Sequence, residues 1–380
     1  MTYARKRLWL GITGVGMTVL LSLAAVTFDL PHRLIPQFAD QTFDRAVAFI
    51  ALAWIWHAAL LFPVDVVGGI VVVTEPQRAL RWLAGLLRAI VVQWLWFTLA
   101  TALLLRTAQQ FGLTIALIVF LLLQLVLLSR QGLLAWLVGG VAVRATSGNL
   151  ARAATQAGIP VGMVREIESD EPSFVAAWSG LDAKRLWVPQ RWVDQLPHEQ
   201  LVIALARRAA VKSRGLRRRG VLVAVAWNTV GFGLAASAPH ADLVTAAGFV
   251  TTIAWFTLWS FVGVLVLPTL SRGAVFAADQ MVRSAHGASL VALTITRLDA
   301  WQDDEAERAL AVESIFHPVP SRGARLRALA QESTAVADSA GAWHATRMML
   351  FLSWAGIGGL SRAVHCNVGR PAVWVMLPGD

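Results

Sequence analysis

The fold of this chain is decided by the stretch from Ser173 to Val211, SFVAAWSGLDAKRLWVPQRWVDQLPHEQLVIALARRAAV. Its first part is typical of a sheet edge, and we expect an extended segment to end at Leu196 and Pro197. The second part predicts an amphipathic helix, because Glu199 lies in the first turn, where the helix dipole favours a carboxylate. The apolar flank of this helix comprises Leu201, Ile203, Ala204, Leu205 and Ala209. The stretch therefore predicts a small sheet that leads into a helix.

The same stretch resembles the catalytic region of membrane zinc metallopeptidases of the HtpX and CAAX-prenyl-protease type. That family carries the pattern NAxAxG, then a strand, LxxEEL and AxLAHExxH. The matching segments of this chain are Ser173–Gly180, Leu186–Pro189, Leu196–Leu201 and Ala204–Val211. Downstream, Ser271–Asp279 resembles SRxxExxAD, and His317–Leu329 resembles HPxxxxRIxxL with a slightly longer spacing. The resemblance covers roughly Leu150 to Leu329.

The positions that bind and activate zinc in that family hold different residues here. An HExxH helix directs two histidines at one Zn²⁺, and the glutamate between them acts as general base for the metal-bound water. Arg207, Arg208 and Val211 stand at these positions, and Val275 replaces the glutamate that is the third ligand. A guanidinium has no lone pair to donate to a cation, and valine has no ligand atom. The resemblance therefore implies a gluzincin-like pseudopeptidase that is not an enzyme and holds no zinc or other cofactor.

Five further residues are expected to hold the fold together or to contact a partner. They are Arg272, Asp279, His317 and Arg325, which are retained from the family pattern, and Trp178. Val211 and Val275 are expected to pack in the core where the metal would otherwise lie, because apolar residues leave no buried charge unpaired. Arg207 and Arg208 are expected to form a basic helix end that faces the membrane, with phosphate or phospholipid binding as the alternative.

The composition is that of a membrane protein. Hydrophobic residues make up 57% of the 380 residues and charged residues only 15%. We expect a predominantly α membrane protein with about six transmembrane helices and a cytoplasmic α+β domain. The expected spans are Leu8–Phe28, Ala46–Phe62 with a kinked continuation past Pro63 to Val73, Ala89–Leu105, Leu113–Leu128, Val221–Ala236 and Leu243–Leu267. A single cysteine, Cys366, excludes a disulfide within the chain.

The expected organisation has five parts. Residues 1–145 hold about four spans, residues 146–220 and 269–335 are the two parts of the peptidase-like domain, residues 221–268 form a transmembrane hairpin, and residues 336–380 form an interfacial tail. Lysines and arginines concentrate on one side of these spans, which places the amino terminus and the peptidase-like domain in the cytoplasm of a bacterial-type inner membrane. The same asymmetry accounts for the net charge of +10 without a nucleic-acid partner.

Several short segments are expected at the membrane surface. Leu133–Val143 is too short to span and is interpreted as an interfacial extension. Met348–Leu360, MMLFLSWAGIGGL, is interpreted as a re-entrant or interfacial helix. The final AVWVMLP is expected to need lipid or a partner to cover it. Asp65 is expected to be a cap or loop residue rather than a proton relay.

The sequence offers three further candidate sites. His57, within a span, is a weak candidate to ligate a haem or pigment metal, although a hydrogen bond to a neighbouring helix is the commoner role. A displaced metal site could use His198, His286 and His317 together with Asp279, but none of these has the helical spacing that metal binding favours. Cys366 and His365 are sequence neighbours without an orienting third group.

The sequence favours a non-catalytic function. Every catalytic group is lost within a retained frame, so we expect an accessory, scaffolding or stabilising subunit of a membrane protein complex, with energy-converting complexes among the candidates. The expected partners are membrane lipids and other membrane-protein subunits, and no nucleic acid. The alternatives are a divergent membrane metalloprotease in protein quality control and a membrane protein that binds a lipid, cofactor or pigment.

Overall fold

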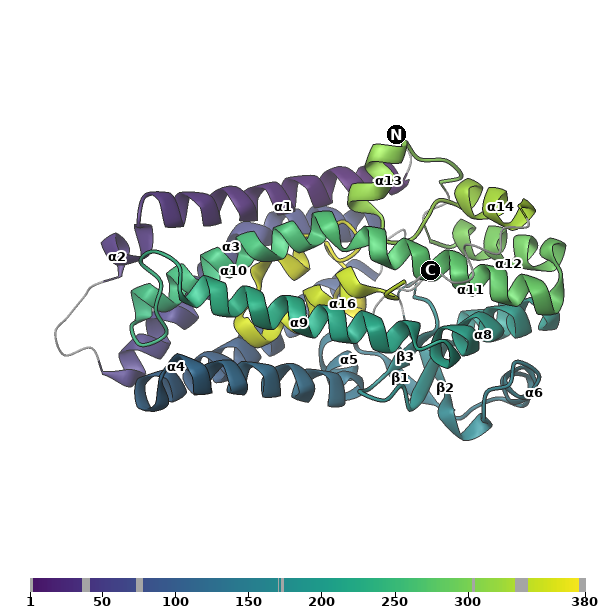
Figure 1. Cartoon of the computed structure of the whole chain (residues 1–380), viewed down its shortest axis with the longest axis horizontal. Helices are drawn as coiled ribbons and strands as arrows, with labels where there is room; N and C mark the ends of the chain where they lie inside the picture. Colours follow the sequence, from purple (N-terminus) through teal and green to yellow (C-terminus); the bar gives the residue numbers. More distant parts are fainter. Residues whose placement is uncertain are drawn as a thin grey trace.

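The computed structural model describes residues 3–35, 42–72, 78–169, 171, 174–302, 305–331 and 341–375. Long apolar helices run along the length of an elongated molecule, and a small sheet with shorter helices forms one end (Figure 1). Ser173, Asp303, Asp304 and the last five residues of the chain lie outside the described residues. The start of the first motif and the end of AVWVMLP are therefore not placed.

Within the described residues, five helical stretches are long and apolar enough to cross a membrane. They are Arg5–Thr27 within α1 (Tyr3–Thr27), Phe43–Ile70 within α3 (Phe43–Val72), α4 (Ala79–Ser129), α9 (Leu216–Ala236), and Ala246–His286, which joins α10 (Ala246–Val266) to α11 (Pro268–His286). The short α2 (Leu30–Leu34) follows α1. The chain is a multi-pass membrane protein, mostly helical.

One of these stretches differs from the expected spans. Helix α3 continues past Pro63 as one helix, in agreement with the expected continuation. Between the expected spans Ala89–Leu105 and Leu113–Leu128, however, the chain stays helical up to Gly112, which reverses it with φ 77° and ψ −178°, a conformation essentially restricted to glycine. A Cβ atom placed on Gly140, beyond the second arm of α4, would lie 2.6 Å from Arg88 Nη2 in the first arm. The two arms of α4 therefore form a hairpin.

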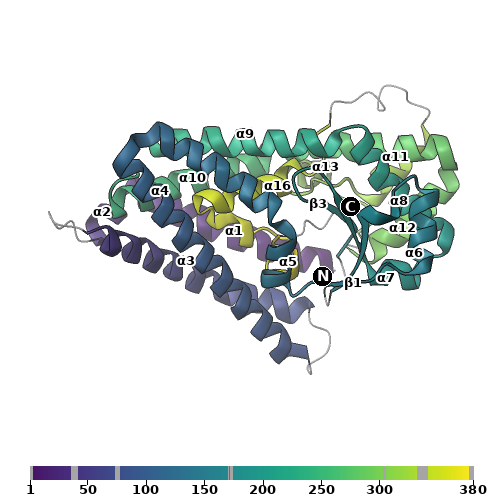
Figure 2. The same cartoon turned by 90° about the horizontal axis from the view of Figure 1, so that it is seen from below.

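The sheet lies at the far end of the molecule from this reversal (Figure 2). Its strands are β1 (Ala142–Arg144), β2 (Val164–Glu168), β3 (Ala177–Ser179) and β4 (Arg185–Pro189), in the order β1-β2-β4-β3. Strand β2 pairs with β4 in parallel, with Val164 opposite Leu186, and the outer pairs are antiparallel. The sheet expected from the first motif is present. Strand β3 lies within Ser173–Gly180, and β4 covers Leu186–Pro189 together with Arg185.

One local prediction was wrong: the extended segment before Leu196 is instead the short helix α7 (Gln190–Gln195). Strand β2 begins only at Val164, because the 3₁₀ turn η2 (Val161–Met163) follows Pro160. The segment Leu133–Val143 falls on helix α5 (Gln131–Gly139) and on β1, through which the chain pairs with the sheet.

Helix α8 (His198–Ser213) is central to the sheet end of the molecule. It packs against α6 (Gly148–Gln156), α11 and α12 (Ala288–Ala300). The remaining short helices are α13 (Leu310–Phe316) and α14 (Arg322–Ala330). Gly215, with φ 66°, joins α8 directly to α9, and α10 passes into α11 at Pro268. The apolar hairpin α9–α10 therefore connects α8, the helix that matches AxLAHExxH, to α11, the helix that matches SRxxExxAD.

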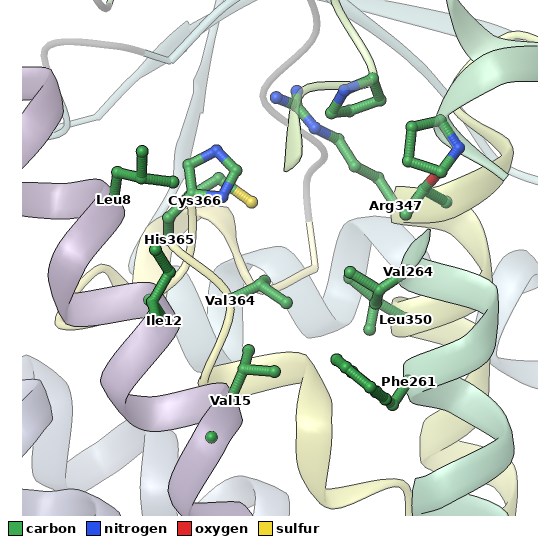
Figure 3. A pocket seen from close by; sticks show the side chains of 15 residues that line it. Leu8, Ile12, Val15, Phe261, Val264, Arg347, Leu350, Val364, His365 and Cys366 are labelled. Atoms are coloured by element: carbon green, nitrogen blue, oxygen red, sulfur yellow. The ribbon is translucent and has the colours of Figure 1, made fainter. Parts of the chain in front are cut away.

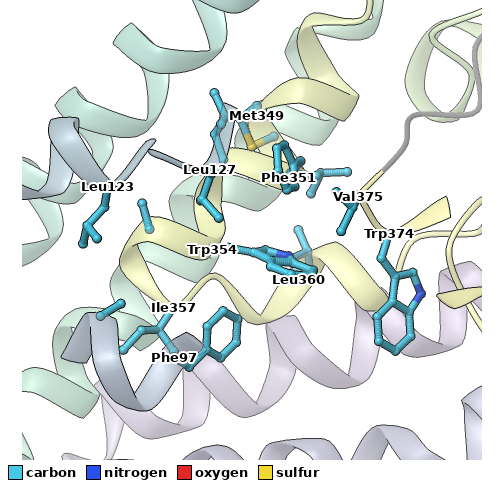
Figure 4. Packing of buried hydrophobic residues seen from close by; sticks show 14 of the residues in the cluster. Phe97, Leu123, Leu127, Met349, Phe351, Trp354, Ile357, Leu360, Trp374 and Val375 are labelled. Carbon is cyan, nitrogen blue, oxygen red and sulfur yellow. The ribbon is translucent and has the colours of Figure 1, made fainter. Parts of the chain in front are cut away.

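The carboxyl-terminal segment lies inside the helix bundle, so its apolar residues are not exposed as expected. It contains α16 (Ala345–Leu352) and the 3₁₀ turns η3 (Ser353–Gly356), η4 (Gly359–Arg362) and η5 (Pro371–Val373). Leu352, Trp354 and Val375 are fully buried, and Trp354 lies among the side chains of neighbouring helices in Figure 4.

Close packing and buried ion pairs hold this segment in place. Gly356 lies against Phe120, Phe232 and Phe256, where a Cβ atom would come within 2.7–3.0 Å of all three rings. Asp65, expected at a cap or loop, lies instead within α3 and pairs with Arg362 of η4. The Asp65 carboxylate also accepts from the backbone N–H of Gly369 at 3.0 Å.

A second pair joins the end of this segment to the loop before β3. Arg370 donates to both carboxylate oxygens of Glu171, with an Nε–Oε2 distance of 2.9 Å, and both side chains are buried. Bidentate pairs of this kind fix orientation as well as adding energy. The segment is thus connected to both the apolar helices and the sheet end.

Candidate functional site

The two positions that replace metal ligands with valine come together in space. Val211 on α8 and Val275 on α11 belong to one small cluster of buried apolar residues and are 0% and 1% exposed. The cluster also contains Leu216, at the start of α9, and Trp343, from the carboxyl-terminal segment. The helix pair expected from the family pattern is therefore present, and its contact is filled by hydrocarbon.

A buried ionic cluster lies beside the valines. Asp279 on α11 accepts from Arg207 Nε at 2.7 Å and from Arg325 of α14 at 2.8 Å and 3.0 Å. All three side chains are at most 6% exposed. Charges this deep are tolerated only when paired and hydrogen-bonded. Arg207 therefore does not face the membrane surface as expected but joins three helices through one carboxylate.

Arg208 occupies the position of the general base and is 1% exposed. Its Nε donates to the backbone carbonyl of Ala176 at 2.6 Å, and its guanidinium lies 5.7 Å from the Trp192 ring and 5.5 Å from the Trp343 ring. The indole N–H of Trp178 donates to the Arg208 carbonyl at 2.7 Å. Arg208 thus ties α8 to the edge of the sheet through hydrogen bonds and cation–π contacts, and it too is absent from the surface.

These residues do not fit a zinc ion. Zinc sites in proteins use thiolate, imidazole or carboxylate ligands. Here two guanidiniums and two valines line the corresponding positions, and the nearest carboxylate, Asp279, is already shared by two arginines. The described residues include no group of three or more His, Cys, Asp or Glu side chains placed to hold a metal.

The carboxyl-terminal segment covers this cluster. The backbone N–H of Ala342 donates to the Leu270 carbonyl at 3.0 Å, and that of Trp343 to the Leu216 carbonyl at 3.1 Å. The chain therefore passes between the starts of α9 and α11 and places Trp343 over the valines. Sequence reasoning missed Trp343, because no periodicity links it to residues far earlier in the chain. The available signal was an apolar tail that carries three arginines, Arg347, Arg362 and Arg370, which need internal partners.

Gly220 on α9 offers a test of this cover. A Cβ atom there would lie 2.0 Å from the Trp343 carbonyl oxygen. Alanine is favoured over glycine in a helix by about 1 kcal/mol, yet we expect Gly220→Ala to lower the unfolding midpoint measured in detergent by circular dichroism, because the clash is with backbone. Gly233→Ala on the same helix is the matched control, since its nearest neighbours lie at 3.6 Å. Equal effects of the two substitutions would contradict the close approach.

Two retained positions are placed away from the cluster. Arg272 on α11 pairs with Glu313 at 2.8 Å and with Ser314 at 3.0 Å, so it fastens α13. His317, at the end of α13, is buried and its ring lies 4.8 Å from that of His365. Of the five residues expected to be structural, Trp178, Asp279 and Arg325 lie at the site.

The remaining candidates have structural contacts. His57 Nε2 lies 3.3 Å from the Gly359 carbonyl, so α3 contacts the carboxyl-terminal segment there. His198 bonds through both ring nitrogens, to Asn149 at 3.0 Å and to Gln156 at 2.9 Å. The displaced metal site is therefore not assembled by the described residues. Cys366 and His365 both line a cavity described below.

The fold is that of a multi-pass membrane protein, mostly helical, with a small sheet at one end. No protein-family model and no curated protein sequence matches the chain. Among solved structures, the chain is similar to the crystal structure of Ste24p from S. mikatae, with a TM-score of 0.62 over 83% of this chain and 80% of that one. The sequence identity is 13%, so the likeness is one of fold.

Proposed function

We propose that this chain is a membrane protein derived from the metallopeptidase fold that acts by binding rather than by hydrolysis. The observation that carries the proposal is the occupation of the catalytic position by a packed cluster of Val211, Val275 and Trp343 beside the Arg207–Asp279–Arg325 ion pairs. A hydrolytic site needs an open coordination position and room for a substrate. A filled, hydrogen-bonded core at that place provides rigidity instead.

The biological role that fits such a molecule is that of an accessory, scaffolding or stabilising subunit of a membrane protein complex. The apolar helices present many exposed large side chains, such as Trp9, Trp56 and Leu99, which need lipid or neighbouring helices around them. We further propose a bacterial-type inner membrane, with the amino terminus and the sheet end in the cytoplasm, on the distribution of lysine and arginine.

Metal content tests the non-catalytic part of this proposal. The protein purified in mild detergent and dialysed against buffered zinc is expected to retain well under one zinc per chain by elemental analysis, because arginine and valine offer no ligand atoms. It is also expected to release no peptides from a casein-like substrate, with or without chelator. Stoichiometric zinc together with chelator-sensitive cleavage would overturn the proposal.

The fold likeness to Ste24p favours one alternative, a divergent active membrane protease. The same measurements decide it, and a restored variant sharpens them. Arg207→His, Arg208→Glu, Val211→His and Val275→Glu together rebuild the family's ligand set, so this variant serves as a reference for zinc retention on the same fold.

The scaffold part needs a different experiment. Native purification from the source membrane, followed by mass spectrometry of the intact assembly, is expected to give companions in a fixed ratio that survives a second purification step. Isolation as a lone monomer would contradict the scaffold role and leave the metal result unaffected.

A further inference from the structure

A largely apolar cavity of about 220 Å³ lies between the first half of α1, the end of α10 and the start of α16. In Figure 3, Leu8, Ile12 and Val15 of α1 face Phe261, Val264 and Leu350 across it. Apolar cavities of this size stay dry and accept apolar ligands, as engineered cavities of similar volume do. Two of its walls, α1 and the end of α10, belong to helical stretches that are long and apolar enough to cross a membrane, so the hydrocarbon available to fill it is that of the bilayer.

One end of the cavity is polar. Arg347, His365 and Cys366 line that end, and in Figure 3 the Arg347 guanidinium points away from the apolar side chains. Arg7 of α1 donates to the His365 carbonyl at the same end. Cationic groups are therefore gathered on one side of a hydrocarbon-lined space.

A second, small polar cavity of about 20 Å³ adjoins this end and shares Arg347 and Pro318 with the first. Arg308 and Arg325 line it together with Arg347, against one carboxylate, that of Asp299. Arg308 and Arg325 also pair with carboxylates elsewhere. Arg347 is the arginine that lines both cavities. Guanidinium groups bind phosphate through charge-assisted hydrogen bonds.

The position along the molecule also matches a bilayer lipid. The polar end lies near the amino terminus of α1 and the carboxyl end of α10, where the apolar helices meet the sheet end (Figure 1). Where such helices cross a bilayer, their ends lie at the level of the lipid headgroups and their middle parts lie in the hydrocarbon core. The acyl chain and the headgroup of a lipid in the cavity would therefore lie at the depths that they have in a bilayer.

We propose that this cavity binds one acyl chain of an anionic phospholipid, with the phosphate held at the Arg347 end. The site is separate from the arginine–valine cluster, and the inference does not depend on whether the chain hydrolyses peptides. A zwitterionic phospholipid and a free fatty acid are competing occupants that the following test excludes or selects.

The test is native mass spectrometry of delipidated protein titrated with dioleoylphosphatidylglycerol, dioleoylphosphatidylcholine or oleate. One molecule of the anionic phospholipid per chain is expected to bind about tenfold more tightly than the zwitterionic one, because both carry an anionic phosphate but only the zwitterionic one adds a choline cation, which the arginines at this end repel. Arg347→Gln is expected to abolish the preference. Arg297→Gln, an exposed arginine of α12, is the matched control.

Filling the cavity tests the chain-binding part. Val264→Phe is expected to abolish the bound lipid, whereas Val262→Phe, at a 43% exposed position on the same helix, should retain it. Val15→Phe is a second filling variant should Val264→Phe fold poorly. Retention of the lipid by both filling variants would overturn the proposal, as would equal binding of the two phospholipids or tighter binding of oleate.

Cys366 supplies an independent readout, because it is the only cysteine of the chain, is half-buried and lines the cavity. Bound phosphatidylglycerol is expected to slow its labelling by a small methanethiosulfonate at least several-fold in the unsubstituted protein, and not in Arg347→Gln at the same lipid concentration. An unchanged labelling rate in the lipid-bound protein would place the lipid elsewhere and overturn the assignment.

Discussion

Asp279→Asn is expected to lower the free energy of unfolding by about 3–5 kcal/mol, the range measured when one partner of a buried pair is removed. The substitution keeps the shape of the side chain but leaves the buried guanidiniums of Arg207 and Arg325 facing a neutral amide. The measurement is denaturant unfolding of the protein in detergent, followed by circular dichroism. Because the cluster joins α8, α11 and α14, the loss should be cooperative across the sheet end.

Asp194→Asn on α7 is the matched control, because Asp194 is exposed, and it should change stability by no more than about 0.5 kcal/mol. Replacing all three cluster residues with Met, Leu and Met at 207, 279 and 325 should recover much of the loss, because apolar replacements of buried ion pairs are often neutral or stabilising. If Asp279→Asn unfolds at the same denaturant concentration as the unsubstituted protein, the pairs do not hold these helices together.

The frame of the site could be predicted because each motif encodes a local element. Glu199 in the first turn and the apolar positions that follow predict α8, and the structure places Glu199 there and buries Leu201, Ile203 and Leu205. The motif after Ser271 falls on α11, which packs on α8. The resemblance of the two motifs to the family pattern therefore identified the two helices on which Val211 and Val275 meet.

The partners of the arginines could not be predicted. A basic pair at a helix end is most often solvated, and the sequence has no local signal that Arg207 would be neutralised by Asp279 or that Arg208 would lie under Trp343. Burial of a charge depends on contacts between segments far apart in the chain. The same reasoning explains why Trp343 was overlooked.

The carboxyl-terminal segment shows a related limit. Met348–Leu360 is too short to span a bilayer and too apolar to be exposed, so the sequence left re-entrant and interfacial forms open. The buried position of this segment depends on close packing, since Gly356 fits against three phenylalanine rings and Gly359 against His57. Glycine indicates only that a close approach is permitted; it does not say to which neighbour.

The pair between Asp65 and Arg362 yields the second large effect. Asp65→Asn is expected to destabilise the protein by about 3–5 kcal/mol, because Arg362, 2% exposed, would remain charged among apolar helices without its carboxylate. Arginine is among the costliest residues to place in such surroundings. The effect should be local to the carboxyl-terminal segment first, so Cys366, four positions along, should react faster with a thiol reagent than in the unsubstituted protein.

The double variant Asp65→Leu with Arg362→Met separates charge from packing. If the ion pair serves mainly to compensate Arg362, the double variant should be more stable than Asp65→Asn, and a double-mutant cycle should give a coupling energy of about 1–3 kcal/mol. If instead the Asp65 carboxylate acts mainly through its bond to the Gly369 N–H, the double variant should be no better than the single one. Gly369 immediately precedes Arg370, the arginine that pairs with Glu171. The second outcome would therefore mean that Asp65 mainly fixes the chain where it returns toward the sheet, and not where Arg362 lies within the helix bundle.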